Sequence, residues 1–465
     1  MMKTSPTKNA FLNRKKLSLW KITKYLGSVF GTLILICLLV FLLFTDPLIN
    51  KFLKVPITNA FTEAYPEYSL QLGEMHYDIW KNRLGTDSII LKRNDSTFTS
   101  SAVSFSVSGI SWMKILWQRG ITLNNLTRTV INAQNIILSF HKSQEGLKFG
   151  MLHISVPNSE LTADSIKYFP LINDEQFFAK SKFKQTRFRF DIPQINIAGL
   201  DYLALLKRNT YKARSINVKD VSADILVNMD SPDDSNATNP FMPNEALLSM
   251  KEIVKVDSLK IINGQLKYCE RFTVGRTPGV ITFNKVNVSV SGIVNHSDNP
   301  DTSIIHANGI FMDSGTMKLF VEIPLNSKDF NLRYSGSLDT MDVTKLNTFV
   351  EPAEHQRIKS GTIHSAEYKI NVNSGYASGM LRVEYEDLSI ALLDKKTGSE
   401  KGVFNQILSI IGKAFIIRGN NVPDEKGKMK IGEIKYTRDP KDTFLQFLWY
   451  ALRGGVSDVV GIPRD

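Results

Sequence analysis

Cysteine is nearly absent from this chain. Only Cys37 and Cys269 occur in 465 residues, and Cys37 lies inside a long apolar stretch. Cys269 is therefore left without a partner for an intrachain disulfide, which excludes a small extracellular scaffold held together by such bonds. A large exported chain without disulfides is more typical of a bacterial periplasm than of a eukaryotic cell surface.

Local signatures of catalysis are also absent. The seven histidines are scattered, without an H-E-x-x-H motif, and the sequence has no G-x-S-x-G, Walker A or G-x-G-x-x-G motif. The serines of Ser106–Gly109 and Ser289–Gly292 alternate with valine, so we interpret them as solvent-facing strand residues. We expect no enzyme activity, no cofactor and no metal site. An anchored hydrolase whose site is assembled from distant residues remains an alternative.

Acidic residues are missing from the first 45 positions, whereas seven Lys and Arg residues lie before Tyr25. The stretch Tyr25–Thr45 has no charged side chain and, as a helix, would reach about 30 Å, the thickness of a bilayer core. We predict a transmembrane helix at 25–45, a basic cytoplasmic tail at 1–24, and residues 46–465 on the other side of the membrane. A long signal peptide is the alternative, and it would export the same residues.

This topology changes how the net charge is interpreted. The chain carries a formal charge of +12, but the tail holds seven of the positive charges. The exported part has the remaining 50 Lys and Arg residues and 45 Asp and Glu residues, so its formal net charge is only +5. We therefore expect no nucleic-acid partner.

Apolar and polar residues alternate through most of the exported part, which predicts half-buried antiparallel strands. We expect a mainly β protein: a single transmembrane helix, then an elongated antiparallel β-groove with short helices and a C-terminal amphipathic helix. The predicted juxtamembrane helix, Asp46–Ala64, is interrupted by Pro56. If the apolar faces of the strands line the groove, its candidate residues are Val103, Phe105, Val107, Val221, Ile225, Val286, Val288, Val290, Leu319, Val321, Tyr368, Ile370, Leu381 and Val383.

Internal repeats and changes in composition divide the chain. The segment Phe105–Leu116 resembles Ile195–Leu206, each reading as a strand, a glycine and a short helix. We expect N-terminal β repeats at 46–229, a linker or long loop at 230–244, a second β region at 245–400, and C-terminal helices with one strand at 401–465. The predicted helices are Val403–Ile417 and Phe444–Val460, with a strand at Lys428–Tyr436.

Between Leu332 and Lys395 the sequence resembles the AsmA-like family of bacterial envelope proteins. Gly336 and Leu338 begin a strand that leads to Leu346-Asn347, and two further strands carry Gly361, Ile363, Ala377, Gly379, Tyr385, Asp387 and Leu388. The segments Val256–Tyr268, Thr437–Pro440 and Phe444–Leu452 also fit. The resemblance implies a protein anchored in the inner membrane of a Gram-negative bacterium, N-terminus in the cytoplasm and bulk in the periplasm. The family carries no catalytic residues to transfer.

Larger relatives, the TamB-like and YhdP-like proteins, are regarded as bridges for phospholipid or as aids to outer-membrane biogenesis. The leading hypothesis for this chain is a non-enzymatic protein that binds or conducts phospholipid in an apolar β-groove. The alternative is a structural or assembly factor that supports outer-membrane proteins without carrying lipid. Partners would be phospholipid, the membrane and other envelope proteins. Some twenty to twenty-five strands would stack to roughly 100–120 Å, which is too short to cross the envelope alone.

Overall fold

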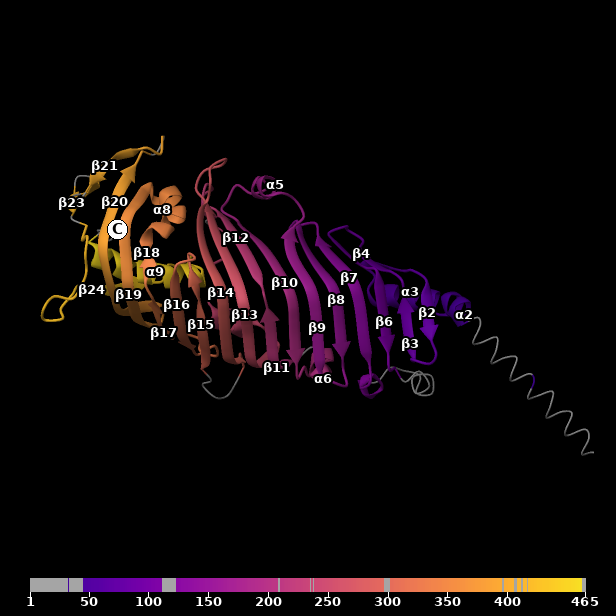
Figure 1. Ribbon diagram of the computed structural model, residues 1–465. Coiled ribbons are helices and arrows are strands. Elements are labelled where there is room, and N and C mark those ends of the chain that lie inside the picture. The colour runs from indigo at the N-terminus through magenta and orange to yellow at the C-terminus, as the bar shows by residue number, and fades with distance from the viewer. Residues whose placement is uncertain are drawn as a thin grey trace, which may run out of the picture.

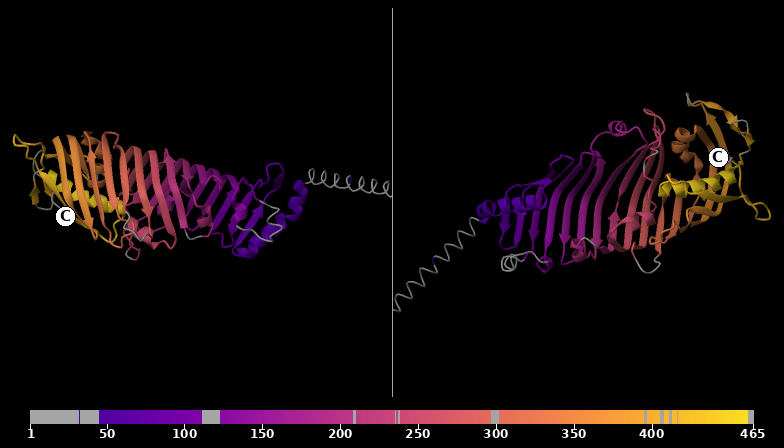
Figure 2. Two further views of the ribbon diagram at one scale, coloured as in Figure 1. Left: turned by 90° about the horizontal axis from the view of Figure 1, so that it is seen from below. Right: turned by 180° about the vertical axis from the view of Figure 1, so that it is seen from behind.

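One long, curved sheet dominates the protein (Figures 1 and 2). The computed structural model describes residues 45–461, except 111–122, 208–209, 235, 237, 297–301, 395–396, 405–407, 411–412 and 416, together with Thr32. Within these residues, 22 strands belong to the one sheet and two more form a separate hairpin. The prediction of a mainly β protein with a largely antiparallel sheet is confirmed.

The N-terminal half begins with two helices and a sheet that is split into two short branches. One branch has the order β2–β3–β6 and the other the order β1–β4–β5, and β5 and β6 both pair with β7. From there β8, β9 and β10 follow in antiparallel order. The bounds are α2 Thr45–Phe52, α3 Lys54–Ala64, β1 Tyr68–Leu72, β2 Met75–Asp78, β3 Arg83–Thr86, β4 Ile89–Arg93, β5 Phe98–Ala102, β6 Ser104–Ser108, η1 Leu123–Leu126, β7 Val130–Phe140, β8 Glu145–Ser155, β9 Glu160–Pro170, α5 Asp174–Phe178, β10 Thr186–Ala198, α6 Tyr202–Leu206, β11 Thr210–Lys219 and β12 Ser222–Asn228.

In the C-terminal half β13 to β17, β19 and β20 continue the sheet, and β20 pairs with both β24 and β21. The short strand β18 pairs with β19, and β22 with β23. The bounds are α7 Pro243–Ser249, β13 Ile253–Arg271, β14 Gly279–Val294, β15 Ser303–Phe311, β16 Gly315–Ile323, β17 Leu332–Leu338, β18 Met341–Asp342, η2 Val343–Leu346, α8 Asn347–Glu354, β19 Gln356–Asn373, β20 Tyr376–Leu393, β21 Glu400–Phe404, β22 Leu408–Ile410, β23 Lys413–Phe415, β24 Ile431–Thr437 and α9 Phe444–Val460.

The stack is shorter than the sequence predicts. β11 and β12 are two pieces along one line, since both pair with β10 on one side and with β13 on the other. The branches before β7 are collinear in the same way. The path from β2 to β24 therefore takes about 15 steps at roughly 4.8 Å, or about 70 Å, because several strands share one position in the stack.

The segment predicted as a linker or long loop, 230–244, connects two strands of the same sheet. β11 and β12 run parallel to β13, and parallel neighbours require a crossover connection. Residues 229–252 supply it and include α7, and Met242, which precedes α7, belongs to the same buried cluster as Phe330 and Phe447. The sheet therefore continues without a break across this segment.

Two predictions for secondary structure have different outcomes. The helix Phe444–Val460 is confirmed with those bounds, as α9. The helix at Val403–Ile417 is wrong, because the structure has the short strands β21, β22 and β23 there. This segment is rich in isoleucine, a residue that favours strands, and its apolar spacing fits either element.

The predicted membrane span, Tyr25–Thr45, lies outside the described residues apart from Thr32 and Thr45. No helix in the described part of the chain is long and apolar enough to cross a membrane. The helical half of the first repeat, 111–116, also lies outside the described residues.

A line of irregular backbone, here called the seam, crosses the middle of the sheet, and the strand register shifts at it between β13 and β14 and between β14 and β15. The non-glycine residues at this line have left-handed backbones, with φ between 48° and 56°. They are Asn135, Ser165, Asp220, Asn263 and Lys285. When the strand registers are extended, the first four of them fall opposite one another or opposite Gly150 and Pro193, and the last falls opposite Gly264. A proline inside a sheet is tolerated at a bulge. An extra residue in a strand reverses which face its side chains point to, so each strand changes phase at this seam.

The seam gives a testable prediction at Asn263, whose φ is 56°. Its side chain donates a hydrogen bond to Asp220 at 2.6 Å and its backbone N–H donates to Asn287 at 3.1 Å. A β-branched residue is poorly tolerated in this conformation, so Asn263→Val should lower the free energy of unfolding by about 1–3 kcal/mol more than Asn263→Gly does. Both variants lose the bond to Asp220, so urea unfolding of the pair isolates the backbone cost. Equal losses would contradict a strained seam.

Candidate functional site

An apolar row crosses the sheet from one end to the other. Paired residues of neighbouring strands share a face, so the register identifies the row directly. Its members are Tyr77, Leu84, Val107, Ile131, Ile154, Leu161, Ile197, Ile216, Leu259, Val290, Ile305, Val321, Tyr334, Ile370, Gly379 and Ile434. The row therefore forms a continuous apolar band along the whole stack.

A second row lies two residues away on the same face. It runs through Met75, Thr86, Phe105, Ala133, Leu152, Ala163, Ile195, Val218, Ile261, Val288, Ala307, Leu319, Gly336, Tyr368, Leu381 and Gly432. Thr86 is its one hydrogen-bonding side chain apart from the phenol of Tyr368. The two rows together widen the band along its full length.

A third row lies beyond the seam, from Leu70 to Phe311. It contains Leu70, Leu91, Ser100, Leu138, Leu147, Tyr168, Phe190, Ala223, Leu266, Phe283 and Phe311. Because the strands change phase at the seam, this row can face the same side as the first two rows although its residues have the opposite parity.

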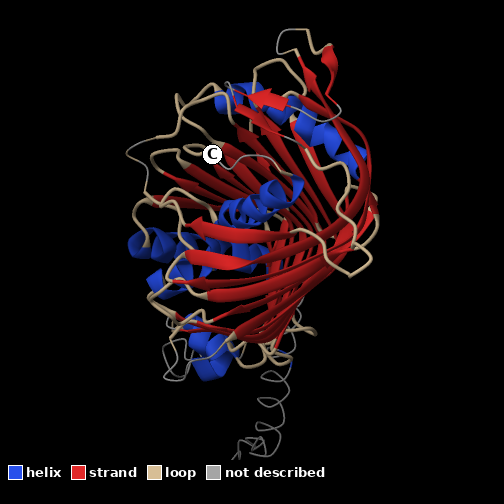
Figure 3. Cartoon of the chain, turned by 90° about the vertical axis from the view of Figure 1, so that its left-hand side faces the viewer, coloured by secondary structure: helices blue, strands red, loops and turns tan. Residues whose placement is uncertain are grey.

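Helix α9 identifies this face as the concave one. Phe447 and Ala451 of α9 pack with Tyr334, Ile370 and Ile434 of the first row in one buried cluster. Helices lie inside the curve of the sheet near its C-terminal end in Figure 3, where the C-terminus is marked. Beyond the seam, burial is the main cause that raises the pKa of Tyr268, and smaller contributions come from Glu270 of β13 and from Tyr450 of α9. The part of β13 beyond the seam therefore lies near the same helix.

The concave face is open at one end and filled at the other. In the first row every side chain from Tyr77 to Ile305 is half-buried, whereas Val321, Tyr334, Ile370 and Ile434 are fully buried, at 3 % exposure or less. The change occurs where α9 and Met242 cover the sheet. The open part therefore extends over the strands before β16.

An apolar depression of about 340 Å³ lies in the open part, on β8, β9 and β10. Phe190 stands directly opposite Tyr168, which in turn stands opposite Leu147. The ring of Phe190 is 6.0 Å from that of Tyr168 and 6.1 Å from that of Phe188. The depression is lined by Leu147, Ile166, Tyr168, Phe188, Phe190 and Ile192.

The lining carries no charge at neutral pH. Burial, together with Glu145, raises the pKa of the Tyr168 phenol. Burial also raises the pKa of Tyr334, and that of Tyr368 to about 12. The phenol of Tyr168 thus remains neutral in the open part, as do those of Tyr334 and Tyr368 in the filled end, so the depression offers apolar contacts rather than ionic ones.

The structure separates the predicted groove residues into two groups and leaves one apart. Phe105, Val107, Ile225, Val288 and Val290 lie on the open part of the concave face, and Val221 and Val286 flank Gly264 at the seam. Leu319, Val321, Tyr368, Ile370, Leu381 and Val383 belong to the core cluster with α9. Val103 is 59 % exposed at the bend between β5 and β6, outside all three apolar rows.

The convex face is polar. Between the first two rows, the alternate residues form the row His76, Gly85, Ser106, Asn132, His153, Thr162, Asn196, Asn217, Lys260, Ser289 and His306. Such a face is suited to water, so the two faces of the sheet differ sharply in polarity. Among the residues that the structure describes, only the concave face offers a continuous apolar surface.

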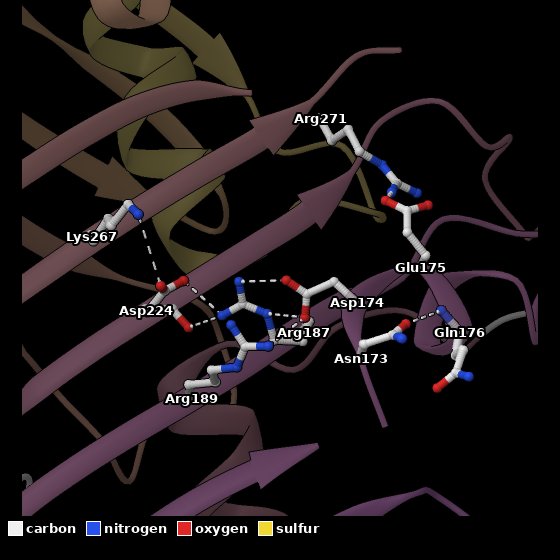
Figure 4. Close-up of polar contacts among 9 residues, drawn as sticks. All are labelled: Asn173, Asp174, Glu175, Gln176, Arg187, Arg189, Asp224, Lys267 and Arg271. Carbon is white, nitrogen blue, oxygen red and sulfur yellow. Dashed lines mark hydrogen bonds and ion pairs between the residues drawn. The ribbon is translucent and has the colours of Figure 1, made fainter. Parts of the chain in front are cut away.

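On the convex face, helix α5 is held by ion pairs of two buried arginines (Figure 4). The side chain of Arg187 is 4 % exposed and lies 2.6 Å from Asp224 and 3.3 Å from Asp174. Arg271 contacts Glu175 at 2.8 Å and stacks over the ring of Phe178 at 4.6 Å. These charges are paired with one another, so we interpret the cluster as the attachment of α5 to the sheet.

None of the six residues that line the depression was among the predicted groove residues. Phe188, Phe190 and Ile192 alternate strictly with Arg187, Arg189 and Asp191, so the signal was present in the sequence. No metal-binding cluster of His, Cys, Asp and Glu occurs among the described residues.

No family model matches this sequence, and no curated protein matches it.

Proposed function

We propose that the protein is a membrane-anchored, non-enzymatic protein of the bacterial envelope that binds phospholipid acyl chains on the open concave face. The observation that carries the proposal is the half-buried first row from Tyr77 to Ile305, together with the apolar depression on β8 to β10. The resemblance of Leu332–Lys395 to the AsmA-like family supports the same assignment. The charge asymmetry around Tyr25–Thr45 supports an inner-membrane anchor with the sheet in the periplasm.

The energetics suit transfer of lipid rather than tight storage. Each methylene moved from water to an apolar surface gains about 0.8 kcal/mol. A lipid tail leaving a bilayer exchanges one apolar environment for another, so its net gain is small. A continuous apolar row lets the tail move along the sheet without exposing its methylenes to water.

Adjacent residues of β7 provide a matched test. Leu138 lies in the third row on the concave face, and its neighbour Ile137 is 39 % exposed and paired with Lys148 on the convex face. A carboxylate at position 138 would remain hydrated but interrupt the apolar path. If it removes contact with about two methylenes, Leu138→Asp should weaken phospholipid binding about tenfold. Ile137→Asp should leave binding unchanged.

The measurement is a titration of the full-length protein, held in an amphipathic polymer, with a phospholipid that carries a fluorophore on its acyl chain. Circular dichroism checks that both variants keep their strands. Equal affinity of the two variants, with the fold retained, would contradict lipid binding on the concave face.

The second candidate is an assembly factor that carries no lipid, and the filled C-terminal end favours it. From β16 onward the concave face is occupied by α9 and Met242, as in an ordinary protein core. On the convex side of the same strands, Phe320 and Met380 interrupt the polar row beside a depression of about 910 Å³. In this alternative, neither Leu138→Asp nor Ile137→Asp affects function in cells.

A further inference from the structure

The turn between β2 and β3 presents Trp80 to solvent at the N-terminal end of the sheet. Trp80 is 90 % exposed, the highest value among the large apolar side chains of the described residues. Exposed tryptophan in such a turn contributes nothing to the core. Tryptophan is enriched at the interface between membrane and water, where its ring lies at the level of the lipid headgroups.

Helix α2 is fixed to the edge strand β2 by side-chain bonds to the backbone. Asn50 accepts a hydrogen bond from the N–H of Met75 at 2.9 Å and donates one to its carbonyl oxygen at 2.8 Å. Asp46 accepts a bond from the N–H of Tyr77 at 3.0 Å and lies 3.3 Å from the ring nitrogen of His76. These bonds satisfy backbone groups of an edge strand and set the direction of α2.

This attachment places Trp80 beside the start of α2. Asp46 bonds to Tyr77, whereas Asn50, which comes later in α2, bonds to Met75, which comes earlier in β2. Helix α2 and strand β2 therefore run antiparallel. Trp80 is three residues beyond Tyr77, which is within about 10 Å along an extended chain. The turn therefore lies at the end of α2 where Thr45 joins the apolar stretch of 21 residues, Tyr25–Thr45.

The turn and the adjoining helices carry exposed apolar and basic side chains. At the end of α2 away from the turn, Phe52 and, in α3, Val55 are 61 % and 56 % exposed, and the ammonium group of Lys51 lies 5.6 Å from the Phe52 ring. Lys81 follows Trp80 directly, with its side chain 68 % exposed, and Asp78 is its acidic neighbour at 3.8 Å. Exposed aromatic residues with lysines beside them suit a surface that has an apolar interior and anionic headgroups.

We propose that the β2–β3 turn, with α2, is a membrane-contacting surface in which Trp80 inserts into the headgroup region of the bilayer that holds the anchor. The proposal rests on the membrane anchor and extends the proposed function, because β2 carries Tyr77 and Met75, the first members of both long apolar rows. The rows then begin at the bilayer surface, where a lipid tail can pass from the membrane onto the sheet.

A fluorescent reporter at position 80 tests this contact. In a background of Cys37→Ser and Cys269→Ala, the variant Trp80→Cys is labelled with nitrobenzoxadiazole, and the full-length protein is placed in vesicles containing anionic phospholipid. We expect a blue-shifted emission that is quenched more by a spin label on the lipid headgroup than by one deep in the acyl chain. The matched control is Ser143→Cys in the β7–β8 turn, at the opposite ends of the strands, which should remain unquenched.

The possible failures can be told apart. Two results would overturn the membrane contact. One is an emission at position 80 that is typical of a fluorophore in water. The other is a blue shift without quenching by the lipid spin labels, which would indicate that the fluorophore contacts protein. If position 80 shows no membrane contact but Leu138→Asp still weakens lipid binding selectively, the proposed lipid binding is supported and the membrane contact is rejected. If position 80 is quenched by headgroup labels but Leu138→Asp has no effect, the contact holds and lipid binding fails.

Discussion

Replacing Phe447 by alanine should release α9 from the sheet. Phe447 is fully buried, its ring lies 5.1 Å from that of Phe330 and 5.8 Å from that of Tyr436, and it packs in one cluster with Ile370 and Ile434. Truncating a buried phenylalanine costs about 3–5 kcal/mol, because its contacts are lost and a cavity remains. This is the largest loss of stability that we expect from a single substitution in α9.

Hydrogen exchange measures this loss locally. If the amides of α9 exchange through undocking of the helix, 3–5 kcal/mol corresponds to about two to four orders of magnitude in protection. Leu445→Ala is the matched control, since Leu445 is 60 % exposed in the same helix and should change stability by no more than about 0.5 kcal/mol. Similar protection of α9 in both variants would show that the helix does not depend on its buried face.

The rows were predictable because alternation is a local property. Phe105 and Val107, or Val288 and Val290, occupy alternate positions in short windows, and this spacing alone places each pair on one face. The C-terminal helix was predictable for a similar reason, since Leu448 and Leu452 follow the helical period and Thr443 with Gln446 forms a capping box at its start.

The direction in which neighbouring strands pair and the part of the concave face that α9 covers were not predictable from the sequence. Nothing in the spacing of Ile216 or Leu259 reveals that β11 and β13 run parallel, because both directions produce the same alternation. Val321 and Val288 also read alike in the sequence, yet Val321 is 2 % exposed beneath α9 and Val288 lies in the open part. Which end of the concave face is covered depends on where α9 packs, and α9 lies more than a hundred residues later in the chain.

The phase change at the seam explains why the third row was overlooked. Leu138 and Ala133 have opposite parity, so simple alternation assigns them to opposite faces. The left-handed residue between them, Asn135, reverses the phase. Asparagine is enriched in this conformation, but one asparagine in a strand is a weak signal without the aligned bulges of the neighbouring strands.

Photo-crosslinking at two adjacent residues of β8 tests the central claim most directly. Leu147 lines the depression on the concave face, and Lys148 stands opposite Lys167 on the convex face, beyond the seam. A photoreactive benzophenone amino acid is introduced at either position in the full-length, membrane-anchored protein, and phospholipid adducts are detected by mass spectrometry after irradiation of whole membranes. Because the two side chains share one strand but point to opposite faces, they sample the same distance from the bilayer.

We expect a phospholipid adduct at position 147 and none at position 148. An acyl chain on the concave face would contact the first side chain directly, while the second would face water on the other side of the sheet. Equal adducts at the two positions, or no adduct at position 147 in a protein that retains its fold, would contradict lipid binding in the groove.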